Sequence, residues 1–287
     1  MNEWAFAIFG ASTEFSPALT KLVETIAPVF TEPAKIRRVA DAKAYEMRVL
    51  AEAEVDRQDI LYRGVVRLEN KEARRQRNAE SVVKIAAQQV LLHDSKPNDQ
   101  PVDEDWIFDF FDKCQDVGNE EMQAVWARML VGEVASPGSF SLRAIQAVKL
   151  MRPSDAKVFT ELCSFRWTIE TDDRLVVPRF ERLPSFEIIL KCDSIGLIHH
   201  QIDANFVVDV VPDKLVSATY FGRPFQLKLP LHSNELPIGS VVLTDIGREL
   251  CKIAGGEQND DTHIEDAIQY WKNHNIQGVA ASEISTA

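Results

Sequence analysis

The chain has 287 residues, of which 45% are hydrophobic and 26% are charged. This composition is ordinary for a folded globular protein and excludes wholesale disorder, a collagen-like fibre and a membrane bundle. The formal net charge of −12 disfavours binding to nucleic acid or anionic lipid unless basic residues gather in one patch.

The start of the chain predicts neither a membrane span nor a secretion signal. No run of about 18 apolar residues occurs, and Glu3 stands where a signal peptide carries a basic residue. The apolar side chains around Trp4 and Phe6 leave a peripheral membrane contact open. We therefore expect a cytoplasmic protein.

The N-terminal region, residues 1–93, is dominated by helical sequence. A first amphipathic helix opens at Pro17. From Pro33 to about Leu92 there is no further proline and only one glycine, Gly64, which predicts one very long helix or two helices broken near Gly64. Because helices of this length rarely stand alone and charges interrupt the heptad pattern, we expect a helical hairpin or a homo-oligomeric stalk instead of a strict coiled coil.

Basic residues recur every four positions along this helix and predict a basic stripe on it. The stripe can pack against the acidic segment 103–121, bind phosphate or lipid headgroups, or face solvent. The stripe, within the basic segment 63–77, consists of Arg63, Arg67, Lys71 and Arg75.

The acidic segment permits a second kind of site. Asp103, Glu104 and Asp105 suit the first turn of a helix, where the helix dipole favours negative charge. Together with Asp109 and Asp112 they also supply the oxygen ligands that divalent cations prefer. We expect no metal site, and a metal-dependent hydrolase using the Asp103–Asp112 cluster is the third hypothesis.

The four cysteines are spaced too widely for a zinc site, because none forms a CxxC pair. We expect them to be reduced and buried, and we expect no cofactor. They are Cys114, Cys163, Cys192 and Cys251.

A central helical bundle is expected over residues 103–165. Within it two helices meet at a tight Pro-Gly turn, and two arginines and a glutamate are placed to pair across the corner. We interpret the corner as structural; a ligand site at the N-terminus of the returning helix is the alternative. The corner residues are Trp126, Arg128, Gly132, Glu133, Pro137, Gly138, Ser139, Ser141 and Arg143.

Residues 166–256 change to an α+β character, so the fold class is mainly α with a C-terminal α+β module. A helix from Phe186 to Ile195 is followed by short β segments and by a helix that Thr244 caps. This order is similar to a winged helix. Its recognition helix is neutral to acidic, which favours protein interaction over DNA reading. Residues 257–287 are expected to hold one helix and a mobile end.

The stretch EEMQAVWARMLVGEVASPGSFSLR, residues 120–143, resembles the signature of the bacterial family DUF2806, a domain of unknown function. The stretches EPAKIRRVADAKA, RRQRNAESV and DWIFDFF agree with the same family. The family brings no established activity, cofactor or catalytic residue, and the resemblance implies a bacterial, cytoplasmic protein. The N-terminal organisation is also similar to alpha-type abortive-infection proteins, which implies a phage-defence setting.

The sequence contains none of the common catalytic motifs. Together with the long helix, this predicts a non-enzymatic interaction or scaffold protein that assembles with itself or with a protein partner. Binding of nucleic acid or a membrane surface by the basic stripe is the second hypothesis, disfavoured by net charge. Removal of residues 1–92 is expected to abolish assembly and to leave residues 103–255 folded.

Overall fold

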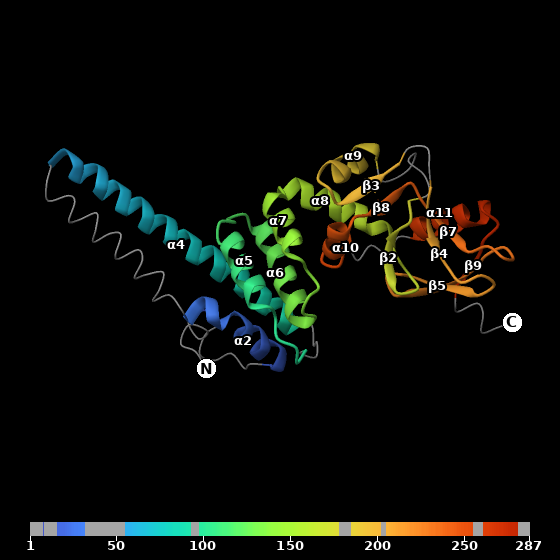
Figure 1. Ribbon diagram of the computed structural model, residues 1–287, viewed down its shortest axis with the longest axis horizontal. Coiled ribbons are helices and arrows are strands. Elements are labelled where there is room, and N and C mark those ends of the chain that lie inside the picture. Colours follow the sequence, from blue (N-terminus) through green and yellow to red (C-terminus); the bar gives the residue numbers. More distant parts are fainter. Residues whose placement is uncertain are drawn as a thin grey trace. The chain divides into compact units, whose positions relative to one another are not determined.

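The computed structural model describes residues 8, 16–31, 55–92, 98–177, 185–201, 205–254 and 261–280 (Figure 1). The chain divides into two compact units, residues 1–150 and 151–287. The described part of the first unit is helical, and that of the second combines helices with antiparallel sheets. The expected fold class, mainly α with a C-terminal α+β module, is therefore confirmed.

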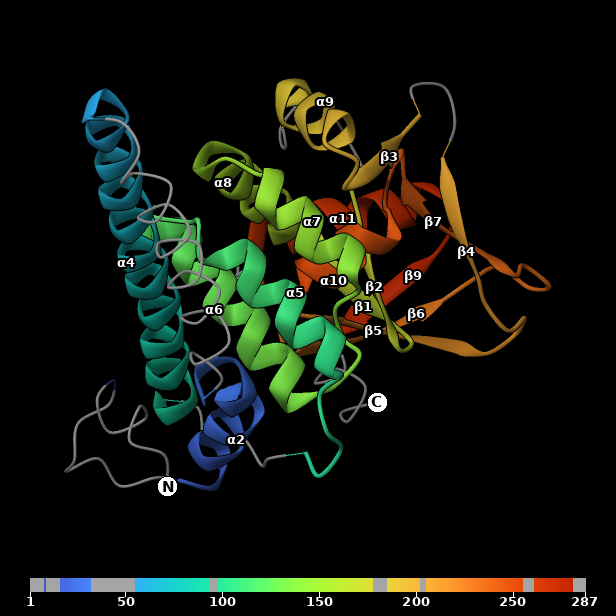
Figure 2. The ribbon, with the colours of Figure 1, turned by 60° about the vertical axis from the view of Figure 1, so that its left-hand side comes forward.

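The first unit is a helical bundle. Helix α4 packs on α6, α2 contacts α4, α5 and α6, and α5 packs on α7 (Figure 2). The helices are α2 (Pro17–Thr31), α4 (Val55–Leu92), α5 (Glu104–Cys114), α6 (Glu120–Ala135) and α7 (Leu142–Leu150).

Local sequence determines where these helices begin. The Asp103 carboxylate accepts a hydrogen bond from the Trp106 backbone N–H at 2.9 Å, and the Asn119 side chain accepts one from Met122 N–H at 3.0 Å. Each bond satisfies an amide that has no partner in the first helical turn. The buried stripes then assemble around Trp126, whose ring meets Phe110 edge-to-face at 5.1 Å.

The long-helix prediction is confirmed over its described part, because α4 runs through Gly64 without a break. The expected helix also included residues 33–54, which lie outside the described residues. The apolar N-terminal stretch with Trp4 and Phe6 lies outside them as well.

The sequence suggested boundaries between residues 93 and 103 and near residue 165, whereas the two compact units meet elsewhere along the chain. The second half of α4 shares a core with α6, and the chain divides between Leu150 and Met151. The reason is tertiary. The polar residues after α4 separate it from the following helices along the chain, but the apolar faces of α4 and α6 still pack together.

The second unit contains shorter elements. These are α8 (Pro153–Leu162), a 3-10 turn (Cys163–Phe165), β1 (Arg166–Ile169), β2 (Asp172–Leu175), α9 (Phe186–Ser194), β3 (Ile198–His200), β4 (Phe206–Asp209), β5 (Leu215–Tyr220), β6 (Arg223–Lys228), β7 (Glu235–Gly239), β8 (Val241–Leu243), α10 (Asp245–Cys251), α11 (Asp261–Asn273) and β9 (Gln277–Ala280).

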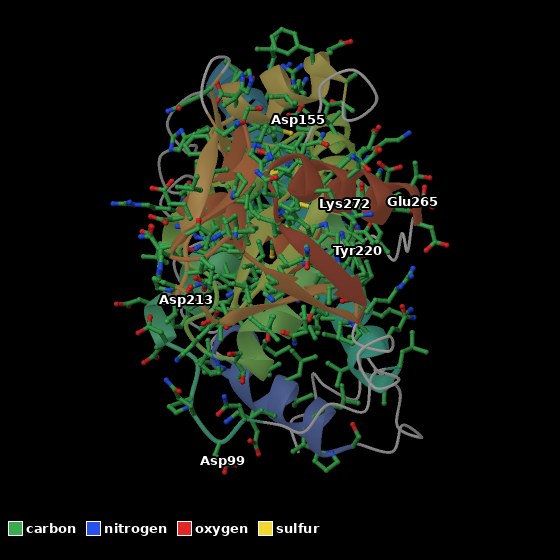
Figure 3. All side chains as sticks on the ribbon, turned by 90° about the vertical axis from the view of Figure 1, so that its right-hand side faces the viewer. Asp99, Asp155, Asp213, Tyr220, Glu265 and Lys272 are labelled. Carbon is green, nitrogen blue, oxygen red and sulfur yellow. The ribbon has the colours of Figure 1, made fainter. Side chains whose placement is uncertain are left out.

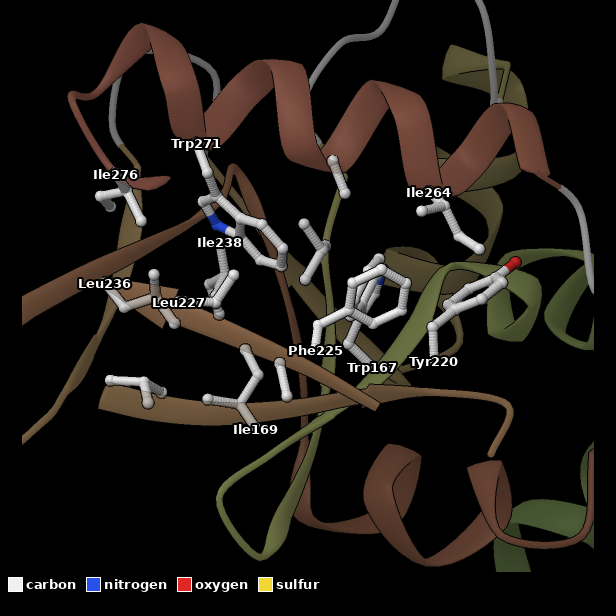
Figure 4. Close-up of a cluster of buried hydrophobic side chains, with 14 residues drawn as sticks. Trp167, Ile169, Tyr220, Phe225, Leu227, Leu236, Ile238, Ile264, Trp271 and Ile276 are labelled. Atoms are coloured by element: carbon white, nitrogen blue, oxygen red, sulfur yellow. The ribbon is translucent and has the colours of Figure 1, made fainter. Parts of the chain in front are cut away.

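A five-stranded antiparallel sheet in the order β2-β1-β5-β6-β9 forms the centre of this unit, and β3–β8 and β4–β7 form two smaller pairs. Helix α11 covers one face of the five-stranded sheet (Figure 4). Trp167 lies in the core between them, with its ring 5.0 Å from Tyr220 and 5.1 Å from Trp271. The Trp271 indole donates to the Pro237 carbonyl at 2.9 Å, so its polar edge is satisfied where its rings are buried.

One expectation for the C-terminal end is wrong over residues 277–280. These residues form β9, which pairs with β6 from Phe225 to Lys228. Small residues gave no local strand signal, and the exposed edge of β6 provides the backbone partners. The following residues, 281–287, lie outside the described part of the chain.

All four cysteines are buried and free of disulfide bonds, as the sequence predicts. Within the described residues, no helix combines the length and apolarity that a bilayer crossing requires.

Candidate functional site

The strongest candidate site is helix α4, whose two halves lie in different environments. Its second half is anchored in the bundle, with Val82, Val83 and Ala86 fully buried. Two polar bonds add to the anchoring: Asn78 Nδ2 donates to the Gln115 carbonyl at 2.9 Å, and Ser81 Oγ donates to Gln123 Oε1 at 2.7 Å. This half is therefore held rigidly.

The first described half of α4 continues past the other helices of the unit and exposes large apolar side chains (Figures 1 and 2). Ile60 is 63% exposed, Tyr62 69% and Leu68 45%. A helix of this length needs packing to be stable. Several large apolar side chains exposed on one such helix therefore indicate a surface that another molecule covers.

The apolar face of the first half is in line with the buried face of the second. Leu61, Val65 and Leu68 each lie 18 residues before a buried residue, which is about five helical turns of roughly 3.6 residues. The buried counterparts are Ala79, Val83 and Ala86. The two apolar faces therefore lie on the same side of the helix, although residues 69–78 between them are polar or charged except for Ala73.

The basic stripe winds around α4 instead of following one face. Residues four apart advance by about 40° on a helix with roughly 100° per residue. Arg63, Arg67 and Lys71 are accordingly exposed, whereas Arg75 has turned to the edge of the core face and is half-buried. Arg63 Nε donates to the Asp59 carbonyl within its own helix, at 3.2 Å.

Arg75 is the stripe residue that reaches the acidic segment. Its guanidinium binds Asp116 through two bonds, Nε–Oδ1 at 2.8 Å and Nη2–Oδ2 at 3.0 Å. The hydrogen bond from Arg75 lowers the pKa of Asp116 below its ordinary value, and the same bond raises the pKa of Arg75. Packing between the two segments is thus observed at this pair.

The acidic cluster itself is engaged in local contacts. Asp103 caps α5, and Lys113 pairs with Asp112 at 2.7 Å and with Asp109 at 3.4 Å. Glu104 and Asp105 occupy the first turn of the helix. No group of three or more side chains in the described ranges is arranged to hold a metal ion.

The corner between α6 and α7 is organised by Glu133. Its buried carboxylate accepts hydrogen bonds from the backbone N–H groups of Gly138 at 2.6 Å and of Phe140 at 2.9 Å. Trp106 on α5 donates from its indole to the Phe140 carbonyl at 2.7 Å. The loop is therefore held from both sides.

The other corner residues surround this arrangement. Trp126 is fully buried, and burial lowers the pKa of Arg128 on the same helix. Ser141 accepts from the Ala144 N–H at 3.2 Å and opens α7, whereas Arg143 is exposed. Gly132 lies in the last turn of α6, and Pro137 and Ser139 flank Gly138, which adopts a φ of +83°. The bonds made by Glu133 favour the structural interpretation of the corner.

Sequence reasoning missed a pocket of about 350 Å³ on the second unit, lined by Arg166 and Lys252 among others. No motif marks it, because its residues come from three strands and the end of α10.

Comparison with known proteins yields one family. The model of the family described as "Protein of unknown function (DUF2806)" matches residues 62–208, just over half of the chain. The match includes most of α4, the α6–α7 corner and the strands as far as β4. No curated protein and no solved structure matches the chain significantly.

Proposed function

The chain belongs to the DUF2806 family of proteins of unknown function, and from the geometry of α4 we propose that it is a non-enzymatic interaction protein that assembles through this helix. The observation that carries the proposal is the exposed apolar side chains Ile60, Tyr62 and Leu68 on the projecting half. A second copy of the chain is the first candidate for the occupant, and a protein partner is the second.

The energetics favour a partner for this half. Fully burying one leucine or isoleucine side chain contributes roughly 1.5–3 kcal/mol. The anchored half fixes the direction of the helix before binding, so less conformational entropy is lost on assembly. A shared face of two helices would have the geometry of a short coiled coil.

Light scattering of the full-length protein tests self-assembly. We expect an oligomer, and we expect the double variant Ile60→Asp and Leu68→Asp to be a folded monomer with a lower melting temperature, because assembly stabilises the folded state. The matched control is Leu231→Asp, which alters an exposed leucine on the other unit and should leave the oligomer intact.

A monomer at all concentrations would overturn self-assembly. Affinity purification from the native host then tests the protein-partner form: a stoichiometric protein that the double variant loses supports it. Recovery of the same proteins with the parent and with the double variant contradicts assembly through α4.

Binding of nucleic acid or a membrane surface is a second candidate function. It is supported by the exposure of Arg63, Arg67 and Lys71, and of the neighbouring Arg74 and Arg77. It predicts binding that weakens steeply with salt and is lost in Arg67→Glu with Lys71→Glu. The control Lys84→Glu changes an exposed lysine on the anchored half of the same helix. Salt-independent binding would contradict this candidate.

The proposed setting comes from two resemblances: similarity to DUF2806 supports a bacterial cytoplasm, and similarity to alpha-type abortive-infection proteins supports phage defence as the process. The winged-helix-like interpretation of residues 166–256 belongs to the same proposal, as a second protein-interaction surface. It is supported by the order α9, β3, β8 and α10, with β3 paired to β8. A metal-dependent hydrolase at the Asp103–Asp112 cluster has less support, since Lys113 already pairs with two of its carboxylates.

A further inference from the structure

We propose that the second unit carries a binding site for a small phosphate-bearing anion, independent of assembly through α4. The site is the pocket of about 350 Å³ on the five-stranded sheet. This volume lies within the range of small-molecule sites, roughly 300–1,000 Å³. Its walls include Arg166, Thr168, Asp173, Thr219, Phe221 and Lys252.

Strand alternation separates this pocket from the hydrophobic core. In β1, Trp167 and Ile169 are buried in the core beneath α11 (Figure 4), so Arg166 and Thr168 lie on the opposite face. Thr168 pairs in register with Thr219 of β5, which brings both hydroxyls to the pocket face. The pocket residues are therefore not required to fill the core.

Arg166 is held in place without being neutralised. Its Nη1 donates to the Cys251 carbonyl at 2.7 Å, and its guanidinium carbon lies 5.3 Å from the centroid of the Phe221 ring. Among the described residues, no carboxylate lies within ion-pair distance of this guanidinium. Its remaining N–H groups form the planar fork that fits a phosphate or carboxylate.

The other walls add donors and leave a positive balance. Lys252 contributes a second cation from the end of α10, against the single carboxylate of Asp173. That carboxylate already accepts a hydrogen bond from Thr168 Oγ1 at 2.8 Å. A guanidinium, an ammonium and the Thr219 hydroxyl converge on a ligand with several charged oxygens, which favours phosphate over a carboxylate.

Calorimetric titration of the full-length protein with inorganic phosphate tests the site. We expect saturable binding, with acetate at least tenfold weaker at the same ionic strength. Glycerol phosphate is the second probe: tighter binding than inorganic phosphate identifies a phosphate monoester as the ligand, whereas weaker binding identifies the free anion.

Variants locate the binding. Arg166→Lys retains the charge but loses the fork, and Lys252→Gln loses a cation; each should weaken phosphate binding at least tenfold. Because Arg166 also bonds to Cys251, Lys252→Gln and Thr219→Val are the decisive variants if Arg166→Lys is unstable. The control Lys272→Gln changes an exposed lysine on α11 (Figure 3) and should bind as the parent does. Absence of saturable phosphate binding, or equal affinity in the parent and in Lys252→Gln, overturns the proposal.

Discussion

Glu133 shows how a single buried charge organises a turn. Its carboxylate accepts two backbone N–H bonds from the loop that joins α6 to α7, and the side chain is 1% exposed. Hydrogen bonds from an amide to a carboxylate are stronger than those to a neutral acceptor. Removing the carboxylate would leave the two backbone N–H groups without an acceptor in a buried site. Glu133 is therefore a structural acid in the best-defined motif of the chain.

We predict that Glu133→Gln destabilises the first unit by about 2 kcal/mol, since one carboxylate oxygen is replaced by an NH₂ donor that faces an amide N–H. Urea unfolding followed by circular dichroism measures the change. The control is Glu121→Gln in the exposed first turn of the same helix, expected within about 0.5 kcal/mol of the parent. Equal stability of the two variants would contradict the role assigned to Glu133.

The Arg75–Asp116 pair makes stability depend on pH. Because Arg75 lowers the pKa of Asp116 in the folded state, the pair stabilises the fold above the unfolded pKa, about 3.9. This contribution is lost as the pH falls through the lower, folded pKa. Arg75 is also the stripe residue that ties α4 to the loop after α5.

We predict that Asp116→Asn lowers the free energy of unfolding by about 1 kcal/mol at pH 7 and that the difference from the parent disappears as the pH falls toward about 2. Urea unfolding across this pH range measures it. Asp99→Asn, at an exposed position (Figure 3), should show no such pH-dependent difference. A constant difference at all pH values would exclude the ion pair as its cause.

Among the elements, the short helix α10 lies very close to the backbone at the start of β3. Thr244 caps it and donates to the Gly196 carbonyl at 2.9 Å, and its own N–H donates to the Leu197 carbonyl at 3.0 Å. A Cβ atom at Gly247 would lie 1.9 Å from that Leu197 oxygen. Glycine at this position therefore permits the approach of α10 to the start of β3.

We predict that Gly247→Ala destabilises the second unit by about 2 kcal/mol or more, because the colliding atom belongs to the backbone and cannot rotate away. Thermal unfolding of residues 151–287 measures the effect. Gly118→Ala in the full-length chain is the matched substitution, since the nearest atom to its Cβ is 4.0 Å away. A neutral Gly247→Ala would show that α10 can shift without loss of packing.

In helix α4, the angular position of each stripe residue decides whether it contacts the rest of the bundle. The four-residue repeat of the stripe drifts around the helix, so Arg75 reaches the core edge while Arg63 lies on the far side. Leu61, Val65 and Leu68 instead keep phase with buried residues 18 positions later, although the mostly polar residues 69–78 lie between the two sets. The projecting half therefore exposes apolar residues on the side of α4 that the bundle covers further along the helix, which is why assembly is the leading proposal.

For the whole molecule, the division between Leu150 and Met151 changes the expected result of truncation. Removal of residues 1–92 takes Val82, Val83 and Ala86 out of the core of the first unit. The expectation that residues 103–255 remain folded is therefore not retained for the first unit, and point variants on α4 are the cleaner test of assembly.

We predict that residues 151–287 expressed alone unfold cooperatively on heating, whereas residues 93–150 alone do not, because the latter lack the buried faces of α2 and α4. Circular dichroism of both fragments measures this. Non-cooperative melting of residues 151–287 would contradict the independence of the second unit.

Much of this protein was determined by its sequence alone. Caps such as Asp103, Asn119 and Thr244, and apolar periodicity, act within a few residues along the chain. They predicted the helix from Phe186, the helix that Thr244 caps and the α+β character of the C-terminal region, and the corner motif indicated the family. What only the tertiary structure decided involves residues far apart in sequence: the sharing of α4 with the core, the pairing of β9 with β6, and the pocket around Arg166. Such contacts depend on which surfaces meet after folding, so local sequence patterns do not predict them.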